Sequence, residues 1–75
     1  MNKIILRFYL VKSKKVFEVI FDLRLSFMEN FELLKDIYDD YLEYLIFDPN
    51  KMIALKRDVP LSSFSFHNFV TLYLY

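Results

Sequence analysis

Residues 16–42 read VFEVIFDLRLSFMENFELLKDIYDDYL, and the spacing of their apolar side chains changes once along this stretch. In the first part every second residue shares one apolar face, which predicts a β-strand. These residues are Phe17, Val19, Phe21, Leu23 and Leu25. From Phe31 onward the spacing is that of an α-helix with one apolar stripe. The stripe consists of Phe31, Leu34, Ile37, Tyr38, Tyr41 and Leu42. We therefore expect a strand, a turn and a helix, with the remaining chain forming a sheet against the stripe.

Two sequence signals compete for the start of this helix. Ser26 precedes Glu29 at the spacing of a capping box. Asn30 is the second candidate N-cap, because it stands directly before Phe31, where the helical period begins. We favour Asn30 for that reason and expect the helix to end at about residues 40–42.

The chain before this stretch predicts a first strand. Its inward residues alternate with more polar ones and are Ile4, Leu6, Phe8 and Leu10. The polar break at residues 12–15 has the length of a hairpin connection, so this strand and the next should pair antiparallel.

The chain after the helix predicts three more short strands. The apolar run at residues 44–47 favours a strand buried on both faces, and residues 48–51, Asp-Pro-Asn-Lys, predict a turn into a return strand at 52–55. Leu61 and Phe64 are expected to plug the core from an irregular or 3₁₀ segment. The last strand alternates at Val70, Leu72 and Leu74.

The resulting order is β-β-α-β-β-β in a single domain, residues 1–75. One helix packed on one face of a mixed sheet is an α+β architecture. The sequence has no glycine, so positions that need a positive φ must use other residues. We predict left-handed geometry at Asn68, in the turn before the last strand.

The charge of the chain sums to zero, which argues against nucleic acid as a partner. The distribution is uneven, because residues 29–43 hold six acids and one base. The acids are Glu29, Glu32, Asp36, Asp39, Asp40 and Glu43. This segment is either a solvated acidic helix face or a charged surface that steers the protein onto a basic partner.

The sequence contains no motif typical of a catalytic or metal-binding site. With no cysteine and with His67 as the only histidine, a His/Cys metal site is impossible. Asp36, Asp39 and Asp40 lack the loop carbonyls of calcium sites. Without glycine there is neither a phosphate-binding loop nor a nucleophile elbow for a serine. We expect no enzymatic activity, no metal and no cofactor.

Membrane insertion is not expected either. No apolar run exceeds four residues, whereas a membrane-spanning helix needs roughly 20. Residues 1–10 are interrupted by Arg7, and no small-residue cleavage site follows. A cytoplasmic location is therefore the expectation.

Two motifs resemble the ubiquitin-like β-grasp fold. One is Phe21-Asp22-Leu23-Arg24-Leu25-Ser26 running into Phe31, Leu34 and Ile37, and the other is Leu61-x-x-Phe64-x-Phe66-x-Asn68-x-x-x-Leu72-x-Leu74. The closer resemblance is to the small bacterial ubiquitin-like proteins of the YukD/EsaB family, which are associated with type VII secretion. It covers essentially the whole chain. It implies a non-enzymatic, protein-binding accessory or regulatory component of such a system.

The sequence departs from the ubiquitin-like pattern in two places. The turn before the last strand normally carries glycine, and here it reads His67-Asn68-Phe69. The sequence ends at Leu74-Tyr75 without the Gly-Gly tail that conjugation and sulfur-carrier chemistry require. We therefore expect a protein that is not conjugated to others, which agrees with the YukD/EsaB resemblance.

The candidate binding residues lie on the sheet face away from the helix. In a β-grasp sheet the first and last strands are neighbours, so their outward residues share this face. The predicted protein-binding residues are Ile5, Arg7, Tyr9, Ile20, Tyr73 and Tyr75. Apolar patches on an open face mark interfaces, and Tyr and Arg are enriched in hot spots. The alternative is ordinary surface aromatics lying beside Lys and Arg stems. We favour an interface with a protein partner, including a homodimer through the sheet face.

The alternative function is a self-associating structural module or a stand-alone equivalent of a secretion-system ubiquitin-like domain.

Overall fold

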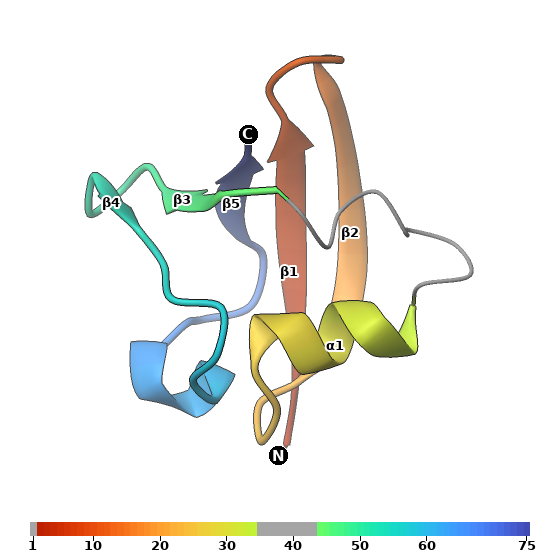
Figure 1. The fold of residues 1–75 in the computed structure, drawn as a ribbon, viewed down its shortest axis with the longest axis vertical. Coiled ribbons are helices and arrows are strands. Elements are labelled where there is room, and N and C mark those ends of the chain that lie inside the picture. Colours follow the sequence, from red (N-terminus) through yellow and green to blue (C-terminus); the bar gives the residue numbers. More distant parts are fainter. Residues whose placement is uncertain (1, 35–43) are drawn as a thin grey trace.

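Five strands of one mixed sheet, an α-helix and a 3₁₀ helix make up the computed structural model, which describes residues 2–34 and 44–75. The elements in chain order are β1 (Lys3–Leu10), β2 (Lys15–Asp22), α1 (Phe27–Leu33), β3 (Ile46–Asp48), β4 (Ile53–Ala54), the 3₁₀ helix η2 (Leu61–Phe64) and β5 (Val70–Leu74). The predicted order β-β-α-β-β-β is confirmed. Helix α1 lies across one face of the sheet (Figure 1).

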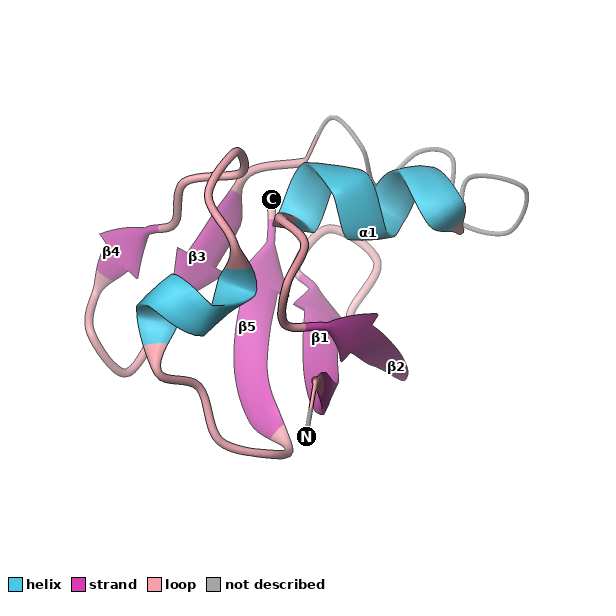
Figure 2. Cartoon of the chain, turned by 90° about the horizontal axis from the view of Figure 1, so that it is seen from below, coloured by secondary structure: helices cyan, strands magenta, loops and turns pink. Residues whose placement is uncertain are grey.

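The strands stand in the order β2-β1-β5-β3-β4 (Figure 2). β1 pairs antiparallel with β2 and parallel with β5, and β3 pairs antiparallel with both β5 and β4. The first and last strands are thus the neighbours at the centre of the sheet, as expected. Because each strand has a period of two, its residues alternate between the helix side and the open side.

The core lies between α1 and the sheet and is built largely from phenylalanine. The predicted inward residues of β1 and β5 are all buried. The Phe8 ring centroid lies 5.5 Å from that of Phe31 and 5.8 Å from that of Phe21, and Phe21 meets Phe31 edge-on at 5.2 Å. Edge-on and tilted pairs of this kind contribute about 0.5–1.5 kcal/mol beyond simple burial. Tight aromatic packing therefore stabilises a small chain that has no disulfide.

Helix α1 begins at Phe27 with Ser26 as its N-cap, so the prediction that Asn30 caps it is wrong. The Ser26 hydroxyl accepts a hydrogen bond from the Glu29 backbone N–H, and the Ser26 N–H donates to the Glu29 carboxylate, both at 3.1 Å. This is the capping box that was the alternative. The earlier start is favoured because it places Phe27 in the core, one helical turn before Phe31.

The second strand is shorter than the sequence predicts. Helix α1 is described as far as Leu33, and its predicted end at residues 40–42 lies outside the described residues. β2 ends at Asp22 because Leu23 and Leu25 leave the sheet and accept backbone hydrogen bonds from Ser62 and Leu61, each at 3.0 Å. Both leucines are half-buried, and Leu61 plugs the core as predicted. Of the helical stripe, Phe31 is buried and Leu34 is half-buried against the core. Residues 37, 38, 41 and 42, and the acids at 36, 39, 40 and 43, lie outside the described residues.

The third strand is not buried on both faces, contrary to prediction. Ile46 and Asp48 are buried, whereas Phe47 lies half-exposed on the open face. The reason is pairing, because Phe47 stands opposite Tyr73 of β5 and must share its face. The turn at residues 48–51 is confirmed, with Asp48 Oδ1 accepting the Asn50 N–H at 2.9 Å.

Left-handed backbone geometry falls on Lys14, Met52, Ser65 and Phe69. The prediction for Asn68 is wrong, since the residue with φ of 65° is Phe69. Asn68 has another role. Its side-chain oxygen accepts the Ile5 N–H at 3.0 Å, while the Phe69 N–H donates to the Ile5 carbonyl at 2.7 Å. The turn is thereby fixed to β1.

Candidate protein-binding surface on the open sheet face

The pairing register arranges the open face in three rows that cross the sheet. One row runs Val16, Tyr9, Tyr73, Phe47 and Ala54, from β2 to β4. The middle row is Glu18, Arg7 and Thr71, and the third is Ile20 and Ile5 with Phe69 beside them. An apolar row therefore lies on each side of a polar one.

Four rings in mutual contact form what we call the aromatic surface, which consists of Tyr9, Phe47, Tyr73 and Tyr75. Tyr73 is its centre, with ring centroids 5.4 Å from Tyr9, 6.5 Å from Phe47 and 6.5 Å from Tyr75. Phe47 also meets Tyr75 nearly edge-on at 6.1 Å. Backbone hydrogen bonds between Leu45 and Tyr75, both 3.0 Å, extend the β3–β5 pairing and hold the C-terminal ring in place.

An ion pair occupies the middle row. Arg7 Nη2 and Nε both donate to Glu18 Oε2, at 2.8 and 3.1 Å. The Arg7 guanidinium also lies 5.8 Å from the Phe69 ring centroid. Solvent-exposed pairs of this kind contribute only about 0–1 kcal/mol. Their consequence here is geometric, because the pair separates the aromatic surface from the aliphatic row.

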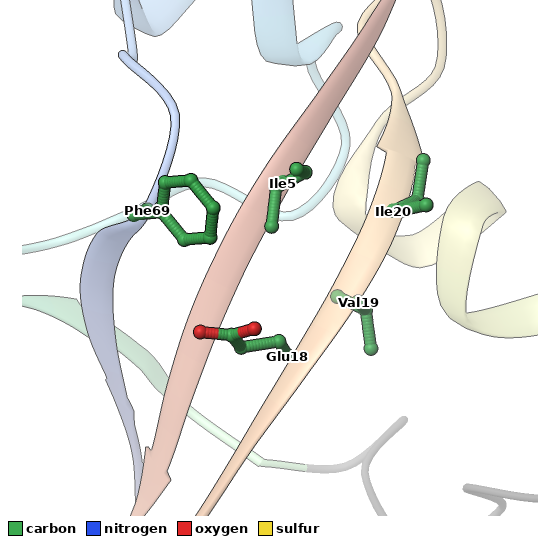
Figure 3. A pocket seen from close by; sticks show the side chains of 5 residues that line it. All are labelled: Ile5, Glu18, Val19, Ile20 and Phe69. Atoms are coloured by element: carbon green, nitrogen blue, oxygen red, sulfur yellow. The ribbon is translucent and has the colours of Figure 1, made fainter.

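The aliphatic row borders a hollow of 310 Å³ lined by Ile5, Glu18, Val19, Ile20 and Phe69. Figure 3 shows Ile5 between Ile20 on one side and Phe69 on the other. The Phe69 side chain is 49% exposed. Its left-handed backbone conformation is energetically unfavourable for a residue with a Cβ. The lining of this hollow is largely apolar, and Glu18 is its charged residue.

The six predicted binding residues fall into two groups on one face. Tyr9, Tyr73 and Tyr75 belong to the aromatic surface, Ile5 and Ile20 border the hollow, and Arg7 lies between them. The face is shared as predicted, but the ion pair divides the expected continuous patch. The sequence does not predict that Phe47 and Phe69 lie on the open face. Phe47 stands in an all-apolar run, where no alternation shows which side of the sheet a residue faces. Phe69 stands in a turn, where the alternation of a strand does not apply.

The part of the chain that the structure describes contains no cluster of three or more His, Cys, Asp or Glu side chains that could hold a metal ion. His67 Nδ1 lies 3.0 Å from the Asn68 carbonyl oxygen. Neither described helix is long and apolar enough to cross a membrane.

Comparison with known proteins identifies the fold. No family model and no curated protein matches the sequence. Among solved structures, the ubiquitin-like domain of Plasmodium falciparum Dsk2 superposes with a TM-score of 0.75 at 19% identity, covering 96% of this chain and 95% of that one. A de novo designed protein based on ubiquitin also gives 0.75, at 16% identity, over 99% of this chain and 88% of that one. The chain therefore has the ubiquitin-like fold that the sequence predicts.

Proposed function

We propose that this ubiquitin-like chain is a non-enzymatic protein-binding module that docks a partner on its aromatic surface. The observation that supports this most is the contact network of four aromatic rings on the open side of the sheet, around Tyr73. Open sheet faces are ordinarily polar. Tyrosine is among the residues enriched where binding energy concentrates.

The packing of the rings also favours binding energetically. Ordering a free side chain at an interface costs about 0.5–1.5 kcal/mol. Rings that already pack against one another, such as Tyr9 on Tyr73, have lost part of that freedom beforehand. Tyrosine adds a hydroxyl that can bond to a partner while its ring supplies contact area.

The resemblance to the YukD/EsaB family gives this module a cellular setting. We propose that it is a cytoplasmic accessory or regulatory component of a type VII secretion system. The first stretch of the motifs that carry the resemblance, residues 21–26, runs from the end of β2 to the N-cap of α1, so it indicates the fold and not a binding site. Self-association as a structural module is the alternative.

The test is capture of the partner from a lysate of the native cells, with wild-type protein beside the Tyr9→Glu/Tyr73→Glu variant. A Ser62→Glu/Ser63→Glu variant is the matched control. Both serines are exposed on η2, and their replacement adds the same negative charge as the two tyrosine substitutions. The captured protein is then purified and titrated against all three. We expect binding to weaken by about 2 kcal/mol, roughly thirtyfold, in the tyrosine variant alone. Equal affinity of all three proteins would contradict the proposal.

A further inference from the structure

Strand β2 is an edge strand of eight residues with regular pairing to β1. It forms one margin of the sheet, and no described strand pairs with its outer side (Figure 2). Its register with β1 runs unbroken from Lys15 to Asp22, and it contains neither proline nor a left-handed residue. Proteins normally protect an edge by shortness, proline, a bulge or charged side chains. The opposite edge, β4, is short at two residues. β2 has eight residues, and the charged side chains of Lys15, Glu18 and Asp22 are its only device of this kind.

The hydrogen bonds of Ile5 show which backbone groups of β2 face outward. The Ile5 N–H and C=O bond to Asn68 and Phe69, on the β5 side. Ile5 and Ile20 are therefore a non-hydrogen-bonded pair, and the backbone groups of Ile20 point away from β1. By the same alternation, those of Val16, Glu18 and Asp22 point outward too.

One of these four edge positions already has a partner. The Asn30 side chain accepts the Asp22 N–H at 2.8 Å and donates to the Asp22 carbonyl at 3.1 Å. Asn30 thus bonds to Asp22 as an added strand would. The outward N–H and C=O groups of Val16, Glu18 and Ile20 have no hydrogen-bond partner among the described residues. These three residues are centred on Glu18.

The three free positions are symmetric about their centre. In antiparallel pairing about a two-fold axis at Glu18, Val16 of one copy lies opposite Ile20 of the other, and each exchanges both backbone hydrogen bonds. Val16 is 57% exposed and Ile20 is 66% exposed, so the pairing buries apolar side chains on the open face. The two Glu18 carboxylates meet at the centre, each with its own Arg7 guanidinium at 2.8 Å.

We infer that two copies of this chain pair antiparallel along their β2 edges, with the two-fold axis at Glu18, into one continuous sheet. The self-complementary pattern Val16-x-Glu18-x-Ile20 selects a second copy over a segment of another protein. This interface uses the backbone edge of β2 and not the rings of the aromatic surface, which begins beside Val16 at Tyr9, and it does not depend on the proposed function. It also differs from a homodimer through the sheet face, because the backbone supplies the contacts.

The test is the solution mass of the chain, measured by sedimentation equilibrium over a series of concentrations. We expect the mass to rise toward twice the 9.2 kDa of one chain. Glu18→Pro removes the central outward N–H, which an edge strand tolerates. It should abolish the dimer, whereas Glu18→Ala, which keeps the N–H, should retain it. Circular dichroism checks that both variants fold, and a second variant, Ile20→Lys, should also be monomeric.

Two results would overturn the inference. The first is a wild-type mass of one chain at millimolar concentration. The second is a dimer that persists in a folded Glu18→Pro variant, and if that dimer is lost in Tyr9→Glu/Tyr73→Glu, self-association lies on the open face. Retention of the dimer in the tyrosine variant, together with loss of partner binding, would support both proposals.

Discussion

Asp22 shows how one side chain ends a strand and fixes the following turn. Its Oδ1 accepts the Arg24 N–H at 2.9 Å and Arg24 Nε at 3.0 Å, and its Oδ2 accepts Arg24 Nη2 at 2.7 Å. These bonds bring the chain out of β2 and toward the helix cap at Ser26. The carboxylate must be ionised to accept all of them, so this turn is sensitive to acid.

The pKa of Asp22 is therefore predicted to be low. The side-chain hydrogen bond from Arg24, followed by the backbone hydrogen bond from Arg24, lowers the pKa of Asp22 from 3.8 to about 2. Because the folded pKa lies below the unfolded value, the contribution to stability is present above 3.8 and is lost as the pH falls through about 2. Carboxyl-carbon NMR titration should show the low midpoint, and Arg24→Gln should raise it. A wild-type midpoint at the ordinary value would contradict the assignment.

Asn30 connects two elements and accounts for much of what sequence reasoning missed between them. Its buried amide donates to the Ser26 carbonyl at 2.9 Å and bonds both backbone groups of Asp22. It thereby joins the first turn of α1 to the end of β2. Asn30→Ala should cost about 2–3 kcal/mol of unfolding free energy, because it leaves these backbone groups without partners. Urea denaturation measures this.

The control for Asn30→Ala is Leu33→Ala on the same helix. Leu33 is largely exposed, and alanine is a good helix former, so we expect a change within about 0.5 kcal/mol. If Asn30→Ala lowers the free energy of unfolding by no more than Leu33→Ala does, water takes the place of the amide in these hydrogen bonds.

Elements were predictable from the sequence where period and local chemistry agree. The alternation in β1, β2 and β5 identifies the buried residues, and the turn at residues 48–51 is determined by Asp48 and Pro49. The errors have tertiary causes. Asn30 looks like a helix cap locally, yet its amide is used by the end of β2, which lies eight residues away. Phe47 acquires its face only through pairing with Tyr73.

At the scale of the whole molecule, the two faces of the sheet differ in structure: one is buried in the core and the other is exposed. The helix side holds the phenylalanine cluster and is closed, whereas the open side carries the aromatic surface, the ion pair and the hollow. The fold class and the position of the six candidate residues on the open face could be predicted, because the alternation of residues shows which side of the sheet each one faces. Their role in binding stays a prediction. The division of that face into two patches could not be predicted, since it depends on the register that places Arg7 opposite Glu18.

Two neighbouring residues of β5 test this difference between the two faces directly. Leu72 is fully buried in the core, whereas Tyr73 lies on the aromatic surface and is half-buried. Leu72→Glu buries an unpaired carboxylate and should unfold the chain, since a domain of this size has only about 5–15 kcal/mol of stability. Tyr73→Glu should stay folded and lose about 1–2 kcal/mol, from its ring contacts. Thermal denaturation followed by circular dichroism compares the two. If Tyr73→Glu also unfolds, the aromatic surface is part of the core, and binding and stability cannot be separated at β5.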